Sequence, residues 1–476
     1  MAVAASIILC LATGYLVVVL AMGKGGSWRE LLFRLCLSMG LGQGLFSIVY
    51  FLACLSAFVG LWWIDFAIFA VLLAAYLFSR SRRRTVHFSF QNQPTAEPGL
   101  LTIAFGVALL AALYSATLRA LAHPYGSGWD SFAIWNLHAR FLYRGDAHWR
   151  DGFTALISWS HPDYPLLLPA AIAHFWTLLG HETAVVSALL GWAFTFSTAG
   201  LLFSALDIFV GRTSALLGGM ALLATPFFIE LGTWQYADVP LSFFFLATLV
   251  LLHRHGAQFA AGAADSRLSS GFLALAGITA GLAAWTKNEG VLFLCALLLS
   301  RLFVRPDSRP LPSTGNSRRS LGITPFLLAL LPTFCILLFF KRFVAPAGDL
   351  FSSPVTMLHK LEDPSRYWVV LKWFGKEVLR FGHWLLIPIP LLMLGVFIML
   401  KGKMPREASP HSRASAVALG LTLAGYFFIY LITPYDIYWH LRFSLNRLLI
   451  QLWPSAIFLY FLRIGSEPLN FSSNHA

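Results

Sequence analysis

Long apolar runs, separated by shorter polar segments, are the dominant pattern of this 476-residue chain. Several runs reach about 18 to 25 residues, the length that an α-helix needs to cross roughly 30 Å of hydrocarbon. They lack the alternation of a membrane β-barrel, and backbone groups in lipid must pair within their own segment, so we expect helices. The pattern predicts an all-α polytopic membrane protein with about thirteen spans. We expect these spans near residues 3–22, 31–56, 59–79, 99–121, 184–209, 213–230, 239–253, 271–286, 290–304, 323–341, 383–400, 414–433 and 447–463.

Composition agrees with this pattern. The chain is 58% hydrophobic and 12% charged, whereas soluble domains are about 25% charged. A net charge of +13 would suggest nucleic acid in a soluble protein. Here the positive charge lies in short loops, which is typical of the cytoplasmic side of a membrane protein, so we expect no nucleic-acid partner. The five cysteines fall in apolar runs and are interpreted as small core residues.

Basic loops set the expected orientation. Residues 79–84, 305–320 and 401–413 are rich in Arg and Lys, and a single serpentine path can put all three in the cytoplasm. The loops that then face outward are 122–182, 231–238, 286–290, 342–382 and 434–446.

The apolar segment 165–180 is short and contains Pro169 and His174. We favour an interfacial or re-entrant outer helix, because a full span would invert every later loop.

Three parts follow from this layout. Residues 1–98 carry extra N-terminal transmembrane helices and a basic loop, residues 99–305 form a core that includes the loop 122–182, and residues 306–476 carry the C-terminal helices with the loop 342–382.

Acids and bases collect in the outward loops, beside the expected span ends. Charged groups at membrane depth are costly and usually mark a pathway or a site. Each residue also has a structural interpretation: the tryptophans suit an interfacial belt, Lys287 an interface anchor, and His161 a turn before Pro162. Convergence of several loops on one cavity favours a site. Its candidate residues are Asp130, His161, Asp163, Asp238, Lys287, Glu289, His440, Arg442 and Arg447.

This set suits transfer of a group from a phosphate-bearing lipid. Lys287, Arg442 and Arg447 would bind the departing phosphate, and a carboxylate, Asp130 or Asp238, would accept the proton of the attacking group.

Four motifs, in order, give the chain a resemblance to a known superfamily. They are "GWDSFAIW" with "LYRGD", "SHPDYPLLLPAAIAHFWTLLG", "QYADVPLSFFFLATLVLL" and "LAGITAGLAAWTKNEG". Over residues 99–303, and less clearly to 463, the chain resembles the C-type glycosyltransferase superfamily. The nearest branch contains the dolichyl-phosphate-mannose–protein mannosyltransferases and the bacterial aminoarabinose transferase.

The resemblance implies an outward-facing site that uses a polyprenyl-phosphate sugar. It implies that Asp130 is the catalytic base and Asp238 a second acid, and that His161 and Asp163 stand near donor phosphate or a metal. Ser131 follows Asp130 where the family often has Glu, so a divalent metal at Asp130, Asp238 and His161 stays open. Three expected spans precede the region of resemblance, and no large soluble domain follows the last one.

The sequence therefore predicts an integral-membrane glycosyltransferase of the bacterial inner membrane. It would move a sugar from a polyprenyl-phosphate donor to an extracytoplasmic lipid, glycan or protein acceptor. A transporter or lipid flippase without covalent chemistry is the main alternative, and an envelope scaffold is a third. The sugar, the acceptor and the oligomeric state stay undecided.

Overall fold

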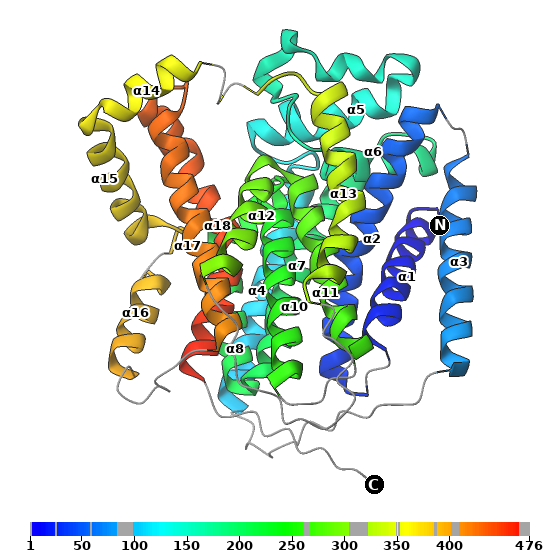
Figure 1. Cartoon of the computed structure of the whole chain (residues 1–476), viewed down its shortest axis with the longest axis horizontal. Helices are drawn as coiled ribbons and strands as arrows, with labels where there is room; N and C mark the ends of the chain where they lie inside the picture. Colours follow the sequence, from blue (N-terminus) through cyan, green and yellow to red (C-terminus); the bar gives the residue numbers. More distant parts are fainter. Residues whose placement is uncertain are drawn as a thin grey trace.

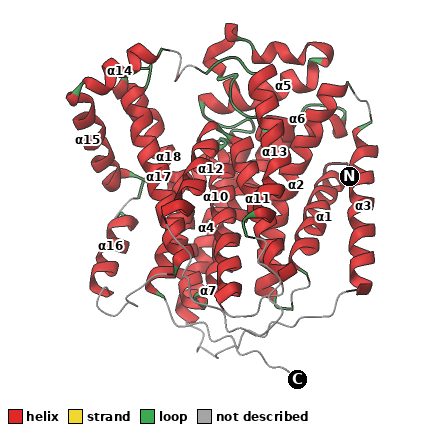
Figure 2. Cartoon of the chain, viewed as in Figure 1, coloured by secondary structure: helices red, strands yellow, loops and turns green. Residues whose placement is uncertain are grey.

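Helices make up the whole regular structure of the described chain. In this computed structural model the described residues are 2–23, 26–57, 60–82, 99–260, 266–303, 322–348, 350, 353–384, 388–400 and 409–465. No strand occurs within these ranges, as Figure 2 shows. The all-α prediction is therefore confirmed.

Ten helices in the described ranges are long and apolar enough to cross a membrane, which makes this a multi-pass membrane protein. They are α1 (Ala2–Met22), α2 (Trp28–Ser56), α3 (Leu61–Arg82), α4 (Gly99–Ala122), α7 (Ala184–Phe209), α10 (Asp238–Ala260), α11 (Ser266–Thr286), α13 (Thr324–Phe343), α17 (Pro410–Ile432) and α18 (Ile437–Ile464).

Three of the roughly thirteen expected spans have a different form. The segment expected at 213–230 is a pair of helices, α8 (Arg212–Leu223) and α9 (Pro226–Thr233), bent by 62° at a break before Pro226. The other two are α12 (Asn288–Phe303), with 16 residues, and α16 (Ile389–Leu400), with 12. At about 1.5 Å per residue, the described part of each is shorter than the hydrocarbon thickness. The described chain thus has ten candidate spans, or eleven if the bent pair counts as one.

The ambiguous segment 165–180 forms a short helix, α6 (Leu167–Leu179), of 13 residues. It is roughly 20 Å long, too short for a full crossing. Protein surrounds it, because every side chain from Leu167 to Trp176 is buried. It packs against α2 and against α5 (Asn136–Arg144), which explains how a Pro- and His-containing apolar segment is stable without spanning lipid.

The long polar segments lie together at one end of the helix bundle (Figure 1). Residues 131–160 form a cap of short helices there, made of η1 (Ser131–Trp135), α5, η2 (Asp146–Phe153) and η3 (Ala155–Ser160). A second pair, α14 (Pro354–Glu362) and α15 (Pro364–Arg380), lies beside α17 and begins at the same end. Most of the basic loops, at residues 83–98, 304–321 and 401–408, lie outside the described residues.

Glycines let two N-terminal helices touch backbone to backbone. A Cβ at Gly14 of α1 would lie 2.0 Å from the Ser38 carbonyl oxygen of α2, and one at Gly42 would lie 2.3 Å from the Cys10 carbonyl oxygen. Small residues that allow such close approach are a main source of helix association in lipid, where no hydrophobic force acts between helices. The α1–α2 pair is therefore set by these two positions.

We expect Gly14→Leu to lower the thermal unfolding midpoint of the purified protein in detergent, because the added side chain must separate the two backbones. Overpacking of this kind costs about 1–3 kcal/mol or more. Gly106→Leu is the matched control, since Gly106 also lies in an apolar span but has open space around its Cβ position. Equal midpoints for the two variants would contradict the close α1–α2 contact.

Candidate functional site

A tight turn presents Asp130 at the polar end of the bundle. Gly126 has φ +80°, which favours glycine, and a Cβ at Gly128 would lie 1.9 Å from the Tyr236 hydroxyl. Ser131 closes the turn by donating from Oγ to the Gly128 carbonyl at 2.6 Å. The turn leads into η1, with Asp130 at its N-cap position. The sequence "GSGWD" is therefore a compact turn that fixes a carboxylate, which explains its glycines.

Asp238 is the first residue of α10, and its side chain has no exposed surface. Its carboxylate accepts from four nitrogens: Lys287 Nζ at 3.1 Å, Gln451 Nε2 at 2.5 Å, and Arg447 Nε and Nη2 at 3.2 and 3.0 Å. A buried carboxylate is stable only when its lone pairs are satisfied in this way. Asp238 thus links the start of α10 to the α11–α12 connection and to the middle of α18.

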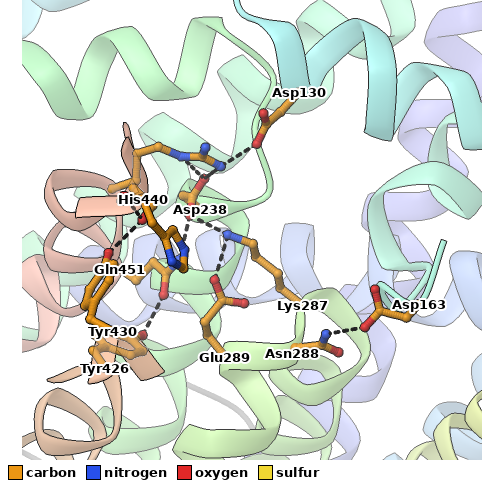
Figure 3. A network of polar contacts seen from close by, with 12 residues as sticks. Asp130, Asp163, Asp238, Lys287, Asn288, Glu289, Tyr426, Tyr430, His440 and Gln451 are labelled. Atoms are coloured by element: carbon orange, nitrogen blue, oxygen red, sulfur yellow. Dashed lines mark hydrogen bonds and ion pairs between the residues drawn. The ribbon is translucent and has the colours of Figure 1, made fainter. Parts of the chain in front are cut away.

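Arg447 links the two acids that were predicted as catalytic. Its Nη2 donates to Asp238 and also to Asp130 Oδ2, at 2.7 Å. Figure 3 shows the dashed lines that join both carboxylates to this guanidinium. The guanidinium carbon lies 4.5 Å from the centre of the Tyr236 ring, a cation–π geometry. Loop 122–182, α10 and α18 therefore meet at one guanidinium.

Lys287 lies in the sharp connection between α11 and α12. The connection is tight because a Cβ at Gly290 would lie 1.9 Å from the Ala283 carbonyl oxygen, and the Gly290 N–H donates to the Lys287 carbonyl at 2.9 Å. The Lys287 ammonium is nearly buried and bridges Asp238 and Glu289, which lies 2.8 Å away. Glu289 lies in the first turn of α12, where the helix dipole favours a negative charge.

A second polar group lies beside this network. Asn288 donates from Nδ2 to Asp163 Oδ2 at 2.8 Å, and Lys341 donates to Asn288 Oδ1 at 2.7 Å and to the Asp163 carbonyl oxygen. Figure 3 shows Asp163 pointing toward Asn288 rather than toward Asp238. Asp163 is therefore next to the predicted site through residues 287–289, and its direct partners come from α12 and α13.

Of the remaining candidates, His440 and Arg442 lie on α18, and His161 lies in the loop 122–182. His440, on the same face of α18 as Arg447, bonds to Thr433 Oγ1 at 2.8 Å and lies within the drawn network. His161 adopts φ +51° and stacks on the Tyr164 ring, with centroids 4.7 Å apart. Arg442 is exposed, and at about 100° per residue it projects about 140° away from Arg447. Among the described contacts it has no ion pair with the two acids.

Several residues of the network were missed by the sequence interpretation. Gln451 donates to Asp238, and its own Oε1 accepts from the Tyr426 hydroxyl at 2.6 Å. The signal was present on α18, because positions 440, 444, 447 and 451 fall on one helix face and carry His, Ser, Arg and Gln. No comparable pattern marked Tyr426, Asn288 or Lys341, each of which lies in an apolar or short segment.

The acids and bases shift one another's pKa values. Burial pulls the pKa of Lys287 down, but the negative charges of Asp238 and Glu289 more than offset this and leave it above its ordinary value. Burial and the nearby Asp130 carboxylate raise the pKa of Tyr236 to about 12. The lysine is therefore held as an ammonium, and the tyrosine as a neutral phenol.

The proposed metal ligands do not form a coordinating set. Among the described residues no three His, Cys, Asp or Glu side chains are grouped to hold a metal ion. Asp130 and Asp238 both direct oxygens at Arg447, and a cation between them would have to displace the guanidinium. His161 is stacked on Tyr164. A metal at Asp130, Asp238 and His161 therefore does not fit this donor arrangement, and no step below depends on one.

Comparison with known proteins gives no relative for this chain. No protein-family model matches it, and neither a curated protein nor a solved structure matches it significantly.

We expect Asp238→Asn to destabilise the protein, because the neutral amide leaves Arg447 and Lys287 under-compensated in a buried setting. Removing one partner of a buried ion pair typically costs about 3–5 kcal/mol. The measurement is the thermal unfolding midpoint in detergent, with Asp151→Asn as the control, since Asp151 is 70% exposed in the cap. A midpoint for Asp238→Asn equal to that of Asp151→Asn would refute the buried network.

The cap should also lose stability in acid through His138, a fully buried residue of α5 whose Nε2 lies 3.2 Å from Ser160 Oγ. Burial, with a smaller effect of His161, lowers the pKa of His138 to about 3. A depressed pKa favours the neutral ring in the folded state, so this stability is complete above pH 6.5 and falls as the pH drops toward 3.

From pH 7.5 to 5.5 the native protein should therefore lose about 1 kcal/mol more stability than His138→Gln, which has no group to protonate. Unfolding midpoints of the two proteins across this range test the difference. Parallel pH curves for the two proteins would show that His138 is accessible to protons in the folded state.

Proposed function

We propose that this protein is an integral-membrane glycosyltransferase. It moves a sugar from a polyprenyl-phosphate-linked donor to an extracytoplasmic lipid, glycan or protein acceptor, at the inner membrane of a bacterium and with the site facing outward. One observation carries the proposal: a single, mostly buried guanidinium, that of Arg447, which is 13% exposed, joins Asp130 and Asp238 near the end of the bundle where the polar loops gather.

The two acids have different environments, which supports different roles. Asp238 is fully buried and accepts from four nitrogens, so its lone pairs are committed and it positions Arg447 and Lys287. The Asp130 side chain is 18% exposed and bonds to Arg447 through Oδ2 alone within the described contacts. Its Oδ1 stays available to an acceptor hydroxyl, and we therefore assign the base role to Asp130.

The cations supply the electrostatic part of the reaction. Arg447 uses Nε and Nη2 on the carboxylates, and its Nη1 has no hydrogen bond to the described residues. Lys287 has three N–H donors and two carboxylate partners. Each cation keeps a donor for the departing phosphate. Preorganised donors of this kind are typically worth about 3 kcal/mol each in the transition state.

The proposed transfer exchanges one bond at the anomeric carbon for another. An acceptor oxygen forms a bond to the anomeric carbon as the bond from that carbon to the phosphate oxygen breaks. The bonding pair leaves with the polyprenyl phosphate, whose charge Arg447 and Lys287 stabilise, and the acceptor proton passes to Asp130. Inversion at the anomeric carbon is the outcome by analogy with the resembling superfamily.

An exposed aromatic pair lies next to the proposed base. Trp129 is 69% and Trp159 51% exposed, with ring centroids 6.1 Å apart. Trp129 directly precedes Asp130 in the chain, so a sugar or lipid acceptor that contacts this pair lies close to the carboxylate. Exposed apolar surface often marks a binding site, which supports an acceptor-side surface formed by the cap.

We expect Asp130→Asn to abolish transfer, with a loss of at least about 100-fold in rate, while the protein stays folded. The measurement is mass spectrometry of envelope lipids, glycans and proteins from a deletion strain that expresses the native chain or a variant. One sugar modification should be absent in the deletion strain and in Asp130→Asn, and restored by the native chain and by Asp151→Asn.

Restoration of the modification by Asp130→Asn would reject the base assignment. A deletion strain that lacks no sugar modification, but shows altered distribution of an unmodified lipid or solute, would instead favour transport without covalent chemistry.

A further inference from the structure

A cluster of arginines lies at the end of the bundle opposite the cap. α7 begins beside the cap, where Glu182 pairs with two arginines of α5, and it ends on the far side, where α2 and α8 begin (Figure 1). The described contacts there join four arginines to two carboxylates, Glu30 and Asp207. The arginines are Arg29 and Arg34 of α2, Arg212 of α8 and Arg254 of α10. Arg254 lies roughly 24 Å along α10 from Asp238, so the cluster is separate from the proposed transfer site.

The Asp207 carboxylate, near the end of α7, holds two arginines from different helices. Its side chain has no exposed surface. Arg29 Nε lies 3.3 Å from Asp207 Oδ2, and Arg212 Nη1 donates to the same oxygen at 3.4 Å. Arg29 Nη1 also donates to the Asp207 carbonyl oxygen at 3.5 Å. One buried carboxylate therefore fixes two guanidiniums next to each other at this end of the bundle.

Both arginines keep part of their surface accessible. The Arg29 side chain is 34% exposed, and that of Arg212 is 21% exposed. The Nη2 atom of each makes no hydrogen bond to the described residues, and neither atom is fully buried. An arginine has five N–H donors in a planar fork that matches a phosphate group. The pair therefore has accessible donors left for an anion.

Positive charge exceeds negative charge in the cluster. Arg29 and Arg212 share the single carboxylate of Asp207, and the other two arginines share that of Glu30. Among the described residues no further carboxylate pairs with these arginines. Charged groups at membrane depth are costly unless they are compensated, so the surplus positive charge favours an anion as the partner.

An exposed apolar stripe starts at the same two arginines. Trp28, Leu31 and Leu35 of α2 are 52%, 48% and 39% exposed and, at spacings of three and four residues, lie on one face of the helix. They belong to the candidate span Trp28–Ser56, so this face contacts lipid chains. The Arg212 guanidinium carbon lies 5.1 Å from the centre of the Trp28 ring, which puts the start of the stripe against the arginine pair.

This arrangement matches a phospholipid better than a soluble anion. A phospholipid carries its phosphate at the membrane interface and its chains along the spans. A soluble phosphate compound would contact the arginines alone and has no counterpart to the apolar stripe. Because the arginines hold surplus charge, a head group with net negative charge fits better than a zwitterionic one, whose own ammonium offsets the phosphate.

We propose that Arg29 and Arg212 bind the head group of an anionic phospholipid. Its phosphate oxygens accept from the two guanidiniums, and its chains lie along Trp28, Leu31 and Leu35. Arginine–phosphate hydrogen bonds are charge-assisted and among the stronger ones in proteins. The bound lipid joins the start of α2 to the start of α8 through one phosphate, and this binding is independent of any sugar transfer.

The test uses the full chain in lipid nanodiscs and two photoreactive lipids, a phosphatidylglycerol and a phosphatidylcholine with the same diazirine at the start of one acyl chain. After irradiation, labelled peptides are mapped by mass spectrometry and normalised to the total label on the chain. We expect phosphatidylglycerol to label the peptide that contains Trp28, Leu31 and Leu35 about fivefold more, because a surplus charge at a membrane surface is worth about 1 kcal/mol. Equal labelling of this peptide by the two lipids would overturn the proposal, and this comparison needs no variant.

Arg29→Gln should lower phosphatidylglycerol labelling of this peptide to the phosphatidylcholine level, and Arg212→Gln should do the same from another helix. Each variant leaves one arginine on Asp207, and its unfolding midpoint in detergent reports whether it folds. Arg150→Gln is the matched control, since it removes one charge from an exposed position in the cap, and it should leave labelling unchanged. A preference for phosphatidylglycerol that survives both cluster variants would overturn the proposal. So would its suppression by an excess of soluble glycerol phosphate, which would assign the arginines to a soluble anion.

Discussion

The burial of one carboxylate constrains the rest of this structure. Asp238 has no exposed surface, and four nitrogens from two separate segments, the α11–α12 connection and α18, satisfy its oxygens. Removing a carboxylate from water is repaid only when the geometry of its partners is good. The start of α10, the α11–α12 connection and the middle of α18 must therefore meet at the same point in space. That requirement brings Arg447 to Asp130, and through Asp130 it fixes the cap over the bundle.

The sequence predicted the helices correctly where a membrane span requires a long run of apolar residues. Ten of the expected spans appear because a helix in lipid requires about 20 apolar residues. It was less informative at three segments. As described, α12 and α16 are apolar but short, and the α8–α9 pair bends at Pro226. α12 is largely buried among other helices, whereas α16 exposes several apolar side chains. Apolar composition does not distinguish these two surroundings.

The residues of the candidate site were also predicted only in part. Asp130, Asp238, Lys287, Glu289 and Arg447 were predicted because charge beside an apolar run is rare, and the structure joins all five. Arg442 was also predicted, because composition does not show that two arginines five residues apart point in different directions. The geometry of a helix does show it. Asn288 and Lys341 could not be found from the sequence, since their contacts with Asp163 depend on how α12 and α13 pack.

An experimental structure of the full chain in nanodiscs with a polyprenyl phosphate bound would test the proposed site most directly. We expect the phosphate to lie within hydrogen-bond distance of Arg447 or Lys287, with Asp130 on the side of the phosphate that faces the cap. A phosphate bound at the opposite end of the bundle, or Asp130 and Asp238 separated from Arg447 in that structure, would contradict it.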